Sequence, residues 1–180
     1  MTDVYAERLQ SIYKDTSEWL RFAEAKNAAL VTFNSVWLGI FLKIYIDGQG
    51  LNNLIMVLCI LISIPLLISM VSIIPSIFKI NIVLFSSKMG NEFAAPSLKD
   101  NLCFYKDISK HNKKSYTCAI VAKYGSKKMH RPNVYETDLI SQIISVSKVC
   151  YGKYCLFNLA MKVNIAIIII SFIGHVLGYY

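Results

Sequence analysis

Three apolar stretches constrain the fold most strongly, because each is long enough to cross a lipid bilayer as a helix. Residues 28–46 contain one charge, Lys43, and residues 54–78 and 163–180 contain no Lys, Arg, Asp or Glu. Crossing the hydrocarbon core takes about 20 apolar residues. Only 17% of the 180 residues are charged, against about a quarter in a soluble domain, so little polar surface remains to cover such helices. The sequence therefore predicts an integral membrane protein with three transmembrane helices.

The distribution of basic residues predicts the orientation of these helices. Residues 47–53, between the first two predicted spans, contain no Lys or Arg, whereas residues 77–158 contain thirteen. Positively charged loops stay in the cytoplasm. We therefore expect the N-terminus and residues 79–162 to be cytoplasmic, and residues 47–53 and the C-terminus to be external. Five cysteines, an odd number, also suit a reducing compartment.

Helical periodicity extends beyond the predicted spans. An apolar seam with spacing of four and three residues precedes and enters the first span: Tyr5, Leu9, Ile12, Thr16, Trp19, Ala23 and Leu30. No Gly or Pro interrupts residues 2–38. The pattern predicts that residues 1–27 form a cytosolic helix continuous with the first span, with the seam, Trp19 included, in the core.

The cytosolic region between the second and third spans is also predicted to be helical. Residues 98–110 and 112–124 resemble two short helices, and Asn133 with Glu136 fits a capping box that opens a helix leading to the third span. No strand-like alternation is present. The expected fold is an all-α integral membrane protein whose three transmembrane helices extend into a cytosolic helical bundle.

Four short motifs lie near the membrane boundaries and in the cytosolic region. Residues 23–34 read AEAKNAALVTFN, residues 104–108 read FYKDI, residues 138–143 read DLISQI, and residues 153–160 read KYCLFNLA. In order and placement they resemble the motifs of the transmembrane effectors of bacterial Pycsar anti-phage systems. One difference is that Ala28 stands at or beside a position where family members usually carry Gly.

The resemblance implies a function in anti-phage defence. Such effectors are paired with a cyclase that makes cyclic UMP or cyclic CMP on infection. The effector binds this nucleotide and impairs the inner membrane, which causes abortive infection. The resemblance therefore implies a bacterial inner-membrane protein that needs no cofactor, takes a cyclic pyrimidine mononucleotide as its regulatory ligand and forms a homo-oligomer. Both a defined pore and bulk membrane disruption remain open.

Candidate ligand-binding residues follow from the chemistry of a cyclic nucleotide, which carries one phosphate charge and one planar base. The basic turn before the capped helix contains Arg131, Lys127 and Lys128, and Arg131 is expected to be the main phosphate contact because Arg binds phosphate in a bidentate manner. Alternatively, these lysines set the topology or contact anionic lipid. A second candidate site consists of the polar residues Lys26, Asp107, Asp138 and Gln142.

Two amides are predicted inside the membrane, Asn34 on the first span and Asn164 on the third, where polar helix–helix contacts are favoured.

No catalytic or metal site is predicted, because the three histidines share no ligand spacing with cysteines or carboxylates. The membrane explains the net charge of +8 without nucleic acid. Two other functions remain open: a membrane anchor that docks a partner protein, and a holin-like toxin that needs no ligand.

Overall fold

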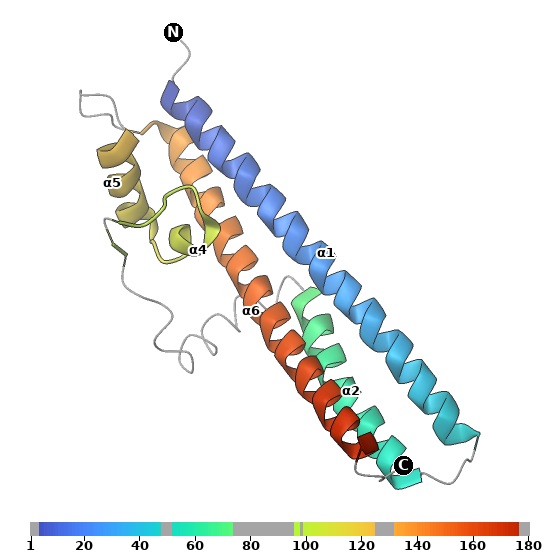
Figure 1. The fold of residues 1–180 in the computed structure, drawn as a ribbon. Helices are drawn as coiled ribbons and strands as arrows, with labels where there is room; N and C mark the ends of the chain where they lie inside the picture. The colour runs from blue at the N-terminus through green and yellow to red at the C-terminus, as the bar shows by residue number, and fades with distance from the viewer. Residues whose placement is uncertain (1–3, 48–51, 74–95, 98, 125–131, 177–180) are drawn as a thin grey trace. The chain divides into compact units, whose positions relative to one another are not determined.

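The structure, a computed structural model, describes residues 4–47, 52–73, 96–97, 99–124 and 132–176. These residues form five helices, namely α1 (Val4–Ile46), α2 (Asn52–Ile73), α4 (Tyr105–Ile108), α5 (Lys113–Tyr124) and α6 (Val134–Val176) (Figure 1). The described part of the chain contains no strand. The prediction of an all-α fold is therefore confirmed.

Two long helices dominate the chain. α1 and α6 each contain 43 residues, and at 1.5 Å per residue each is about 65 Å long. The predicted continuity between the N-terminal seam and the first span is confirmed. The predicted capping box is also confirmed, because Glu136 N donates to Asn133 Oδ1 and Asn133 N donates to Glu136 Oε2, both at 2.8 Å. α6 then continues through Gly152 without a break.

Two of the described helices have the length and composition of a membrane span. They are α1 and residues Val134–Ile173 of α6. The apolar segment of α2, Met56–Ser72, is shorter, and residues 74–78 of the predicted second span lie outside the described residues. Two membrane-length helices are thus present, and the three-span topology stays a prediction.

The chain divides into two compact units. The first unit comprises residues 1–23 and 76–152, and the second comprises residues 24–75 and 153–180. In the first unit, helices α1, α4, α5 and α6 and the loop before α4 contribute one apolar core: Tyr5, Leu9, Ile12, Leu102, Ile108, Tyr116, Ile120, Leu139, Ile140, Ile143 and Ile144. This unit therefore has the core of a small water-soluble helical domain.

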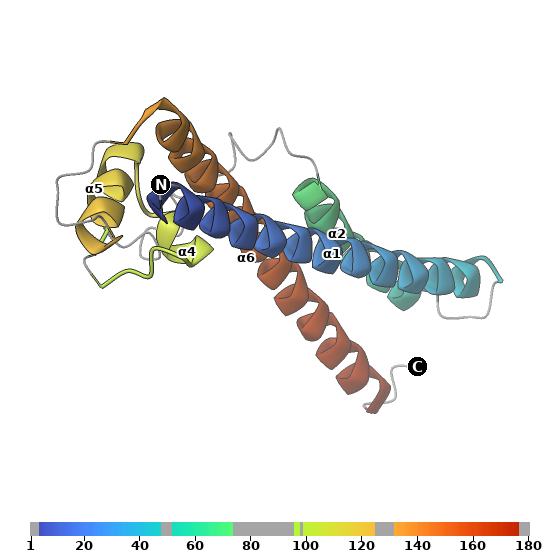
Figure 2. The same cartoon turned by 90° about the horizontal axis from the view of Figure 1, so that it is seen from above.

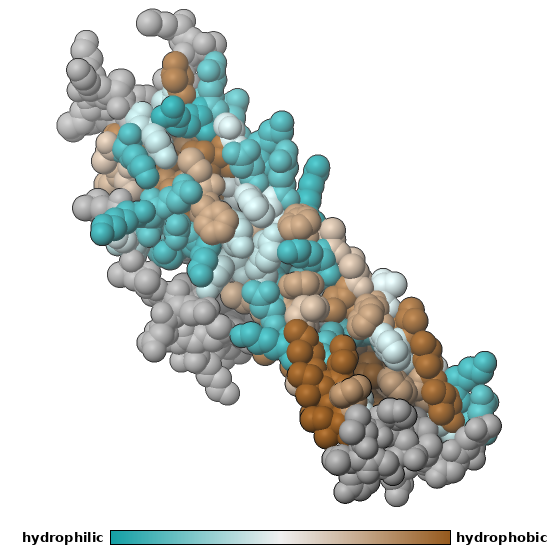
Figure 3. All heavy atoms as spheres, viewed as in Figure 1, coloured by the Kyte–Doolittle hydropathy of each residue, from teal (hydrophilic) through white to brown (hydrophobic). Residues whose placement is uncertain are grey.

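The second unit is built from one segment each of α1, α2 and α6. Its large apolar side chains are mostly exposed, and polar side chains on all three helices are buried: Asn27, Asn34, Ser69, Ser72, Lys153 and Asn164. Figure 3 shows hydrophobic side chains, in brown, gathered over this unit. Within the unit, the C-terminal part of α6 diverges from α1 in both ribbon views (Figures 1 and 2). This distribution is typical of a protein surrounded by lipid.

Two details differ from the predictions for the first unit. Trp19 is 40% exposed rather than part of the core, although the other seam positions are buried. The helix predicted at residues 98–110 is only the single turn α4. It is short because Asn101 and Asp107 accept hydrogen bonds from backbone N–H groups of the preceding loop, which stabilise turns in place of helix.

Candidate functional site

The basic turn predicted to bind phosphate lies mostly outside the described residues, which exclude Arg131, Lys127 and Lys128. The helix that follows it is described. Its capping box uses the N–H groups of Asn133 and Glu136. The first turn of an α-helix has four N–H groups without intrahelical partners, so capping fixes the start of α6 and still leaves donors for an anion.

Asp107, a predicted ligand residue, belongs to a network of charges within the first unit. Its Oδ1 accepts a hydrogen bond from Lys110 Nζ at 2.6 Å, and its Oδ2 accepts one from Asn101 N at 3.1 Å. Lys110 Nζ also donates to Asp100 Oδ1 at 3.3 Å. Asp107 therefore joins the loop before α4 to the residues after it.

Asp100 is the buried carboxylate of this network. Its Oδ2 accepts a hydrogen bond from Ser97 N at 2.8 Å and lies 3.4 Å from His111 Nε2. Burial raises the pKa of the Asp100 carboxyl, but the Ser97 N–H and the Lys110 ammonium outweigh burial and hold it below its usual value. The hydrogen bond to Asp107 raises the pKa of Lys110 above its usual value against the opposing effect of burial. Asp100 and Lys110 therefore stay ionised near neutral pH.

The remaining members of the predicted polar site are dispersed. Asp138 and Gln142 lie one turn apart on α6, and both are exposed. Among the described residues, no hydrogen bond or ion pair joins either of them to Asp107. Lys26 belongs to the second unit, where its Nζ lies 5.4 Å from the ring centroid of Tyr154 and 5.5 Å from that of Phe157. These cation–π contacts place Lys26 against α6.

An aromatic surface on the first unit is a feature that the sequence analysis missed. The Trp19 ring meets Phe104 edge-on at 6.1 Å between centroids and lies 5.8 Å from Tyr105, while Phe104 and Tyr105 are 4.6 Å apart. Part of this surface is open to solvent, since Trp19 is 40% exposed. Exposed aromatic faces of this kind can stack against a nucleobase.

A buried lysine in the second unit was also missed. Lys153 is only 3% exposed; its Nζ donates to the backbone oxygen of Ser72 at 3.1 Å and pairs with Glu24 Oε1 at 3.2 Å. Ser72 lies in the last turn of α2, where backbone carbonyls lack intrahelical partners. Asn27 Nδ2 donates to the backbone oxygen of Lys153 at 3.4 Å. Lys153 therefore links α6 to both other helices of the unit.

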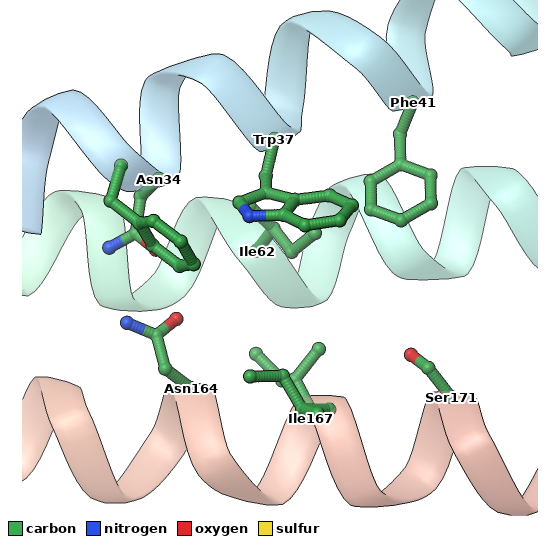
Figure 4. A pocket seen from close by; sticks show the side chains of 9 residues that line it. Asn34, Trp37, Phe41, Ile62, Asn164, Ile167 and Ser171 are labelled. Carbon is green, nitrogen blue, oxygen red and sulfur yellow. The ribbon is translucent and has the colours of Figure 1, made fainter.

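Asn34 and Asn164 meet across a pocket of the second unit. They point into it from α1 and α6 (Figure 4). Asn34 is 1% exposed and Asn164 is 7% exposed, yet the Nδ2 group of each has no hydrogen-bond partner among the described residues. The two predicted amides are thus brought to one site, but no direct hydrogen bond joins them.

Comparison with known proteins identifies the family. Within the described residues, no group of three or more His, Cys, Asp or Glu could hold a metal ion. No curated protein and no solved structure matches the chain. A family model described as the Pycsar effector protein domain matches residues 8–178, which include all or most of each described helix. The chain therefore belongs to the Pycsar effector family, the family that its sequence motifs resemble.

Proposed function

We propose that this Pycsar effector binds a cyclic pyrimidine mononucleotide, cyclic UMP or cyclic CMP, and in response impairs the bacterial inner membrane during phage infection. The observation that carries the proposal is the opposite polarity of the two units. The first unit has an apolar core and suits a water-soluble ligand, whereas the second exposes apolar side chains and suits lipid. In this proposal the first unit is the sensor for a soluble signal and the second unit is the membrane-active part.

The proposed phosphate contact is Arg131, assisted by Lys127 and Lys128. These cations directly precede the capped start of α6. A helix N-terminus carries about half a positive charge, which complements a monoanionic phosphate. Trp19, which is 40% exposed, offers a stacking surface for a base on the same unit. Asp107, Asp138, Gln142 and Lys26 remain the alternative ligand residues.

The proposed response is a rearrangement of the second unit, accompanied by self-association. α1 and α6 are helical on both sides of the boundaries between units, so either helix can carry a displacement from the ligand to the membrane. In the resting state, the ion pair of Lys153 with Glu24 and its contact with Ser72 hold the three helices together. Loosening these contacts would free α2 and α6 to form a pore or disrupt the bilayer.

Ligand binding is tested by thermal shift and calorimetry on the detergent-purified full chain. Cyclic UMP or cyclic CMP at 100 times its Kd should add about 2.7 kcal/mol of apparent stability, and cyclic dinucleotides should add none. Arg131→Ala should weaken binding about ten- to a hundredfold, as expected for the loss of a charge-assisted contact. Lys113→Ala, an exposed cation on α5, is the matched control. Equal affinity of wild type and Arg131→Ala would exclude the basic turn as the phosphate site.

A second set of variants tests whether the base binds at Trp19 or at the alternative residues of α6. Trp19→Ala should reduce affinity by about tenfold if the base stacks there, since base–aromatic stacking contributes about 1–3 kcal/mol. Phe22→Ala changes another exposed aromatic residue of α1 and should have little effect. If only Asp138→Asn or Gln142→Ala weakens binding, the exposed face of α6 holds the base instead.

The membrane response is tested by dye leakage from vesicles that contain the purified protein. Leakage should require the cyclic nucleotide, and three Gly residues inserted after Asn158, within α6, should abolish leakage while affinity is unchanged. Leakage without nucleotide would instead indicate a holin-like toxin. Binding without leakage at any protein density would favour a membrane anchor that docks a partner protein.

The proposed topology places the N-terminus in the cytoplasm and the C-terminus outside, so that the first unit meets a cytosolic nucleotide. The thirteen Lys and Arg residues of residues 77–158 support this orientation. An alkaline phosphatase fusion at the C-terminus should be active, and a fusion after Lys88 should be inactive. The reverse pattern would contradict both the topology and the cytosolic ligand.

A further inference from the structure

The pocket in the second unit combines an apolar wall with two unsatisfied hydrogen-bond donors. It has a volume of about 240 Å³ and lies between α1, α2 and α6. Phe33, Trp37 and Ile168 line it and are 42–58% exposed, so the pocket opens to the surroundings of the unit. Asn34 and Asn164 are buried inside it.

The unsatisfied amides require an acceptor. Each Nδ2 group is buried without a partner among the described residues, and an unpaired amide in an apolar environment is costly. A single bridging water could accept from both amides, but one water occupies about 30 Å³ and would leave most of the pocket of about 240 Å³ empty. An acceptor attached to an apolar chain matches both the amides and the wall.

The depth of the amides identifies this acceptor. Lys162 is exposed on α6 two residues before Asn164, so the amide lies about 3 Å further along the helix. Asn34 of α1 lines the same pocket as Asn164 and therefore lies at a similar depth. Lysines at the ends of spans extend their ammonium groups to the headgroups. The two amides therefore lie just below the phosphate level, where the acyl esters of glycerophospholipids meet the hydrocarbon.

We propose that the pocket binds one acyl chain of a glycerophospholipid, with the ester carbonyl accepting hydrogen bonds from Nδ2 of Asn34 and Nδ2 of Asn164. The acyl chain lies along Phe33, Trp37 and Ile168, which line the pocket together with the two amides. No direct hydrogen bond joins the two amides, so the bound lipid connects α1 and α6 and contributes to the packing of the second unit. This site is separate from the nucleotide site, and its test involves no nucleotide.

The chemical test compares ester and ether lipids. The full-length protein in mild detergent is offered equal amounts of a diacyl phosphatidylethanolamine and its dialkyl ether analogue, which lacks the carbonyl, and retained lipid is counted by native mass spectrometry. If the ester hydrogen bond is as strong as a hydrogen bond between transmembrane helices, the ester lipid should be bound about three- to twentyfold more tightly than the ether lipid. Wild type should therefore retain the ester lipid at least threefold better. Equal retention of the two lipids would overturn the proposal without any variant.

Variants test whether Asn34 and Asn164 cause the preference for the ester lipid. Asn34→Leu and Asn164→Leu should each bring the ester-to-ether ratio toward one. Asn158→Leu makes the same change at an exposed position of α6 and should leave the ratio unchanged. An equal loss of preference in all three variants would overturn the assignment to the pocket.

Fluorescence identifies the occupant. The chain contains two tryptophans, so Trp37 is the single reporter in the Trp19→Phe protein. In nanodiscs, a low fraction of ester lipid brominated on its acyl chain should quench Trp37 more strongly than the same fraction of brominated ether lipid. A second copy of the chain as occupant would instead give disulfide-linked dimers from Ile168→Cys together with equal quenching by both lipids. That result, or recovery of a free fatty acid in place of phospholipid, would overturn the proposal.

Discussion

The two units differ in what they bury. The first unit has a contiguous apolar core, and its exposed large hydrophobic residues among those described are few: Val4, Trp19, Phe22, Val134 and Tyr135. The second unit exposes Ile, Leu, Val, Met and Phe side chains along all three helices and buries amides, hydroxyls and one lysine. Burial of apolar area drives folding in water, whereas packing and internal polar contacts hold helices together in lipid.

A single helix shows both kinds of burial. The buried positions of α1 keep the same four-and-three spacing along its length, but their chemistry changes from Leu9 and Ile12 to Asn27 and Asn34. The helix geometry is therefore constant, while the surface exposed around the buried face differs between the two units. The spacing identifies the buried face of α1, and amides occupy that face only in the second unit, where Leu30 lies between them.

The largest expected effect is the loss of stability when a cavity is made in the core of the first unit. Ile143 is fully buried in the apolar core, and Ile143→Ala should cost about 2–5 kcal/mol of unfolding free energy. Hydrogen exchange of α5 amides in the detergent-solubilised protein measures the loss. Ile169→Ala removes the same atoms from a residue that is 53% exposed in the second unit and should leave exchange nearly unchanged. Equal effects would remove the contrast between the units.

A charge on the outer face of the second unit should disfavour membrane insertion by almost as much free energy. Ile169→Lys should disfavour membrane insertion of α6 by about 2.5–3.5 kcal/mol if this face contacts lipid near the bilayer centre. Val134→Lys, at a residue that is 81% exposed in the first unit, should change stability by no more than about 0.5 kcal/mol. A translocon insertion assay measures the first variant and thermal unfolding the second. Normal insertion of Ile169→Lys would argue that water, not lipid, surrounds the second unit.

A smaller effect is expected at the capped start of α6. Asn133→Ala removes the acceptor of the Glu136 N–H group and should cost about 0.5–2 kcal/mol. Faster hydrogen exchange should be confined to the first turns of α6, since α6 is otherwise held by packing. Asn158→Ala, at an exposed residue in the interior of the same helix, is the control. Unchanged exchange in Asn133→Ala would show that the capping box does not stabilise the helix.

The smallest expected effect is the pH dependence of the first unit. The pKa of Asp100 is lower in the folded protein than in the unfolded chain, so this carboxylate stabilises the fold at a pH above its unfolded pKa. The stabilisation is lost as the pH falls through the folded pKa. We therefore expect the stability of the first unit to decrease below about pH 4. Burial and the nearby Glu136 raise the pKa of Tyr5 to about 12. Together with the raised pKa of Lys110, this shift gives stability that is present below about pH 10 and lost at higher pH.

Thermal unfolding across this range measures the effect, and Asp100→Asn should flatten the acid limb. Asp138→Asn changes an exposed carboxylate on α6 and serves as the control. An acid limb that is identical in wild type and Asp100→Asn would assign the transition to other carboxylates.

Local patterns in the sequence predicted much of the fold. The capping box of α6 and the continuous α1 depend on residues within a few turns of one another. Trp19 was assigned to the core because its spacing fits the seam, but spacing does not show whether another helix covers a residue. The helix expected at residues 98–110 was replaced by turns that depend on side-chain hydrogen bonds.

The candidate sites were less predictable, because they depend on contacts between distant segments. Lys153 is buried against Ser72, which is 81 residues away in the sequence. The sequence shows this lysine as the first residue of the motif at residues 153–160 but gives no sign of its burial. Hydropathy predicts that Asn34 and Asn164 lie within the membrane, but the pocket between them is lined by residues of three helices that are far apart in the sequence. The aromatic surface likewise requires Trp19 to meet Phe104.

The place of α6 in the chain has a consequence for the order in which the protein is made. Both units require α6: Leu139 and Ile143 complete the apolar core of the first, and Lys153 and Asn164 close the second. The ribosome synthesises α1, α2, α4 and α5 before any of these residues. Neither unit can therefore be complete before α6 is made: the start of α6 completes the first unit, and its later residues then complete the second. A nascent chain of this effector should remain unable to respond to a signal until then.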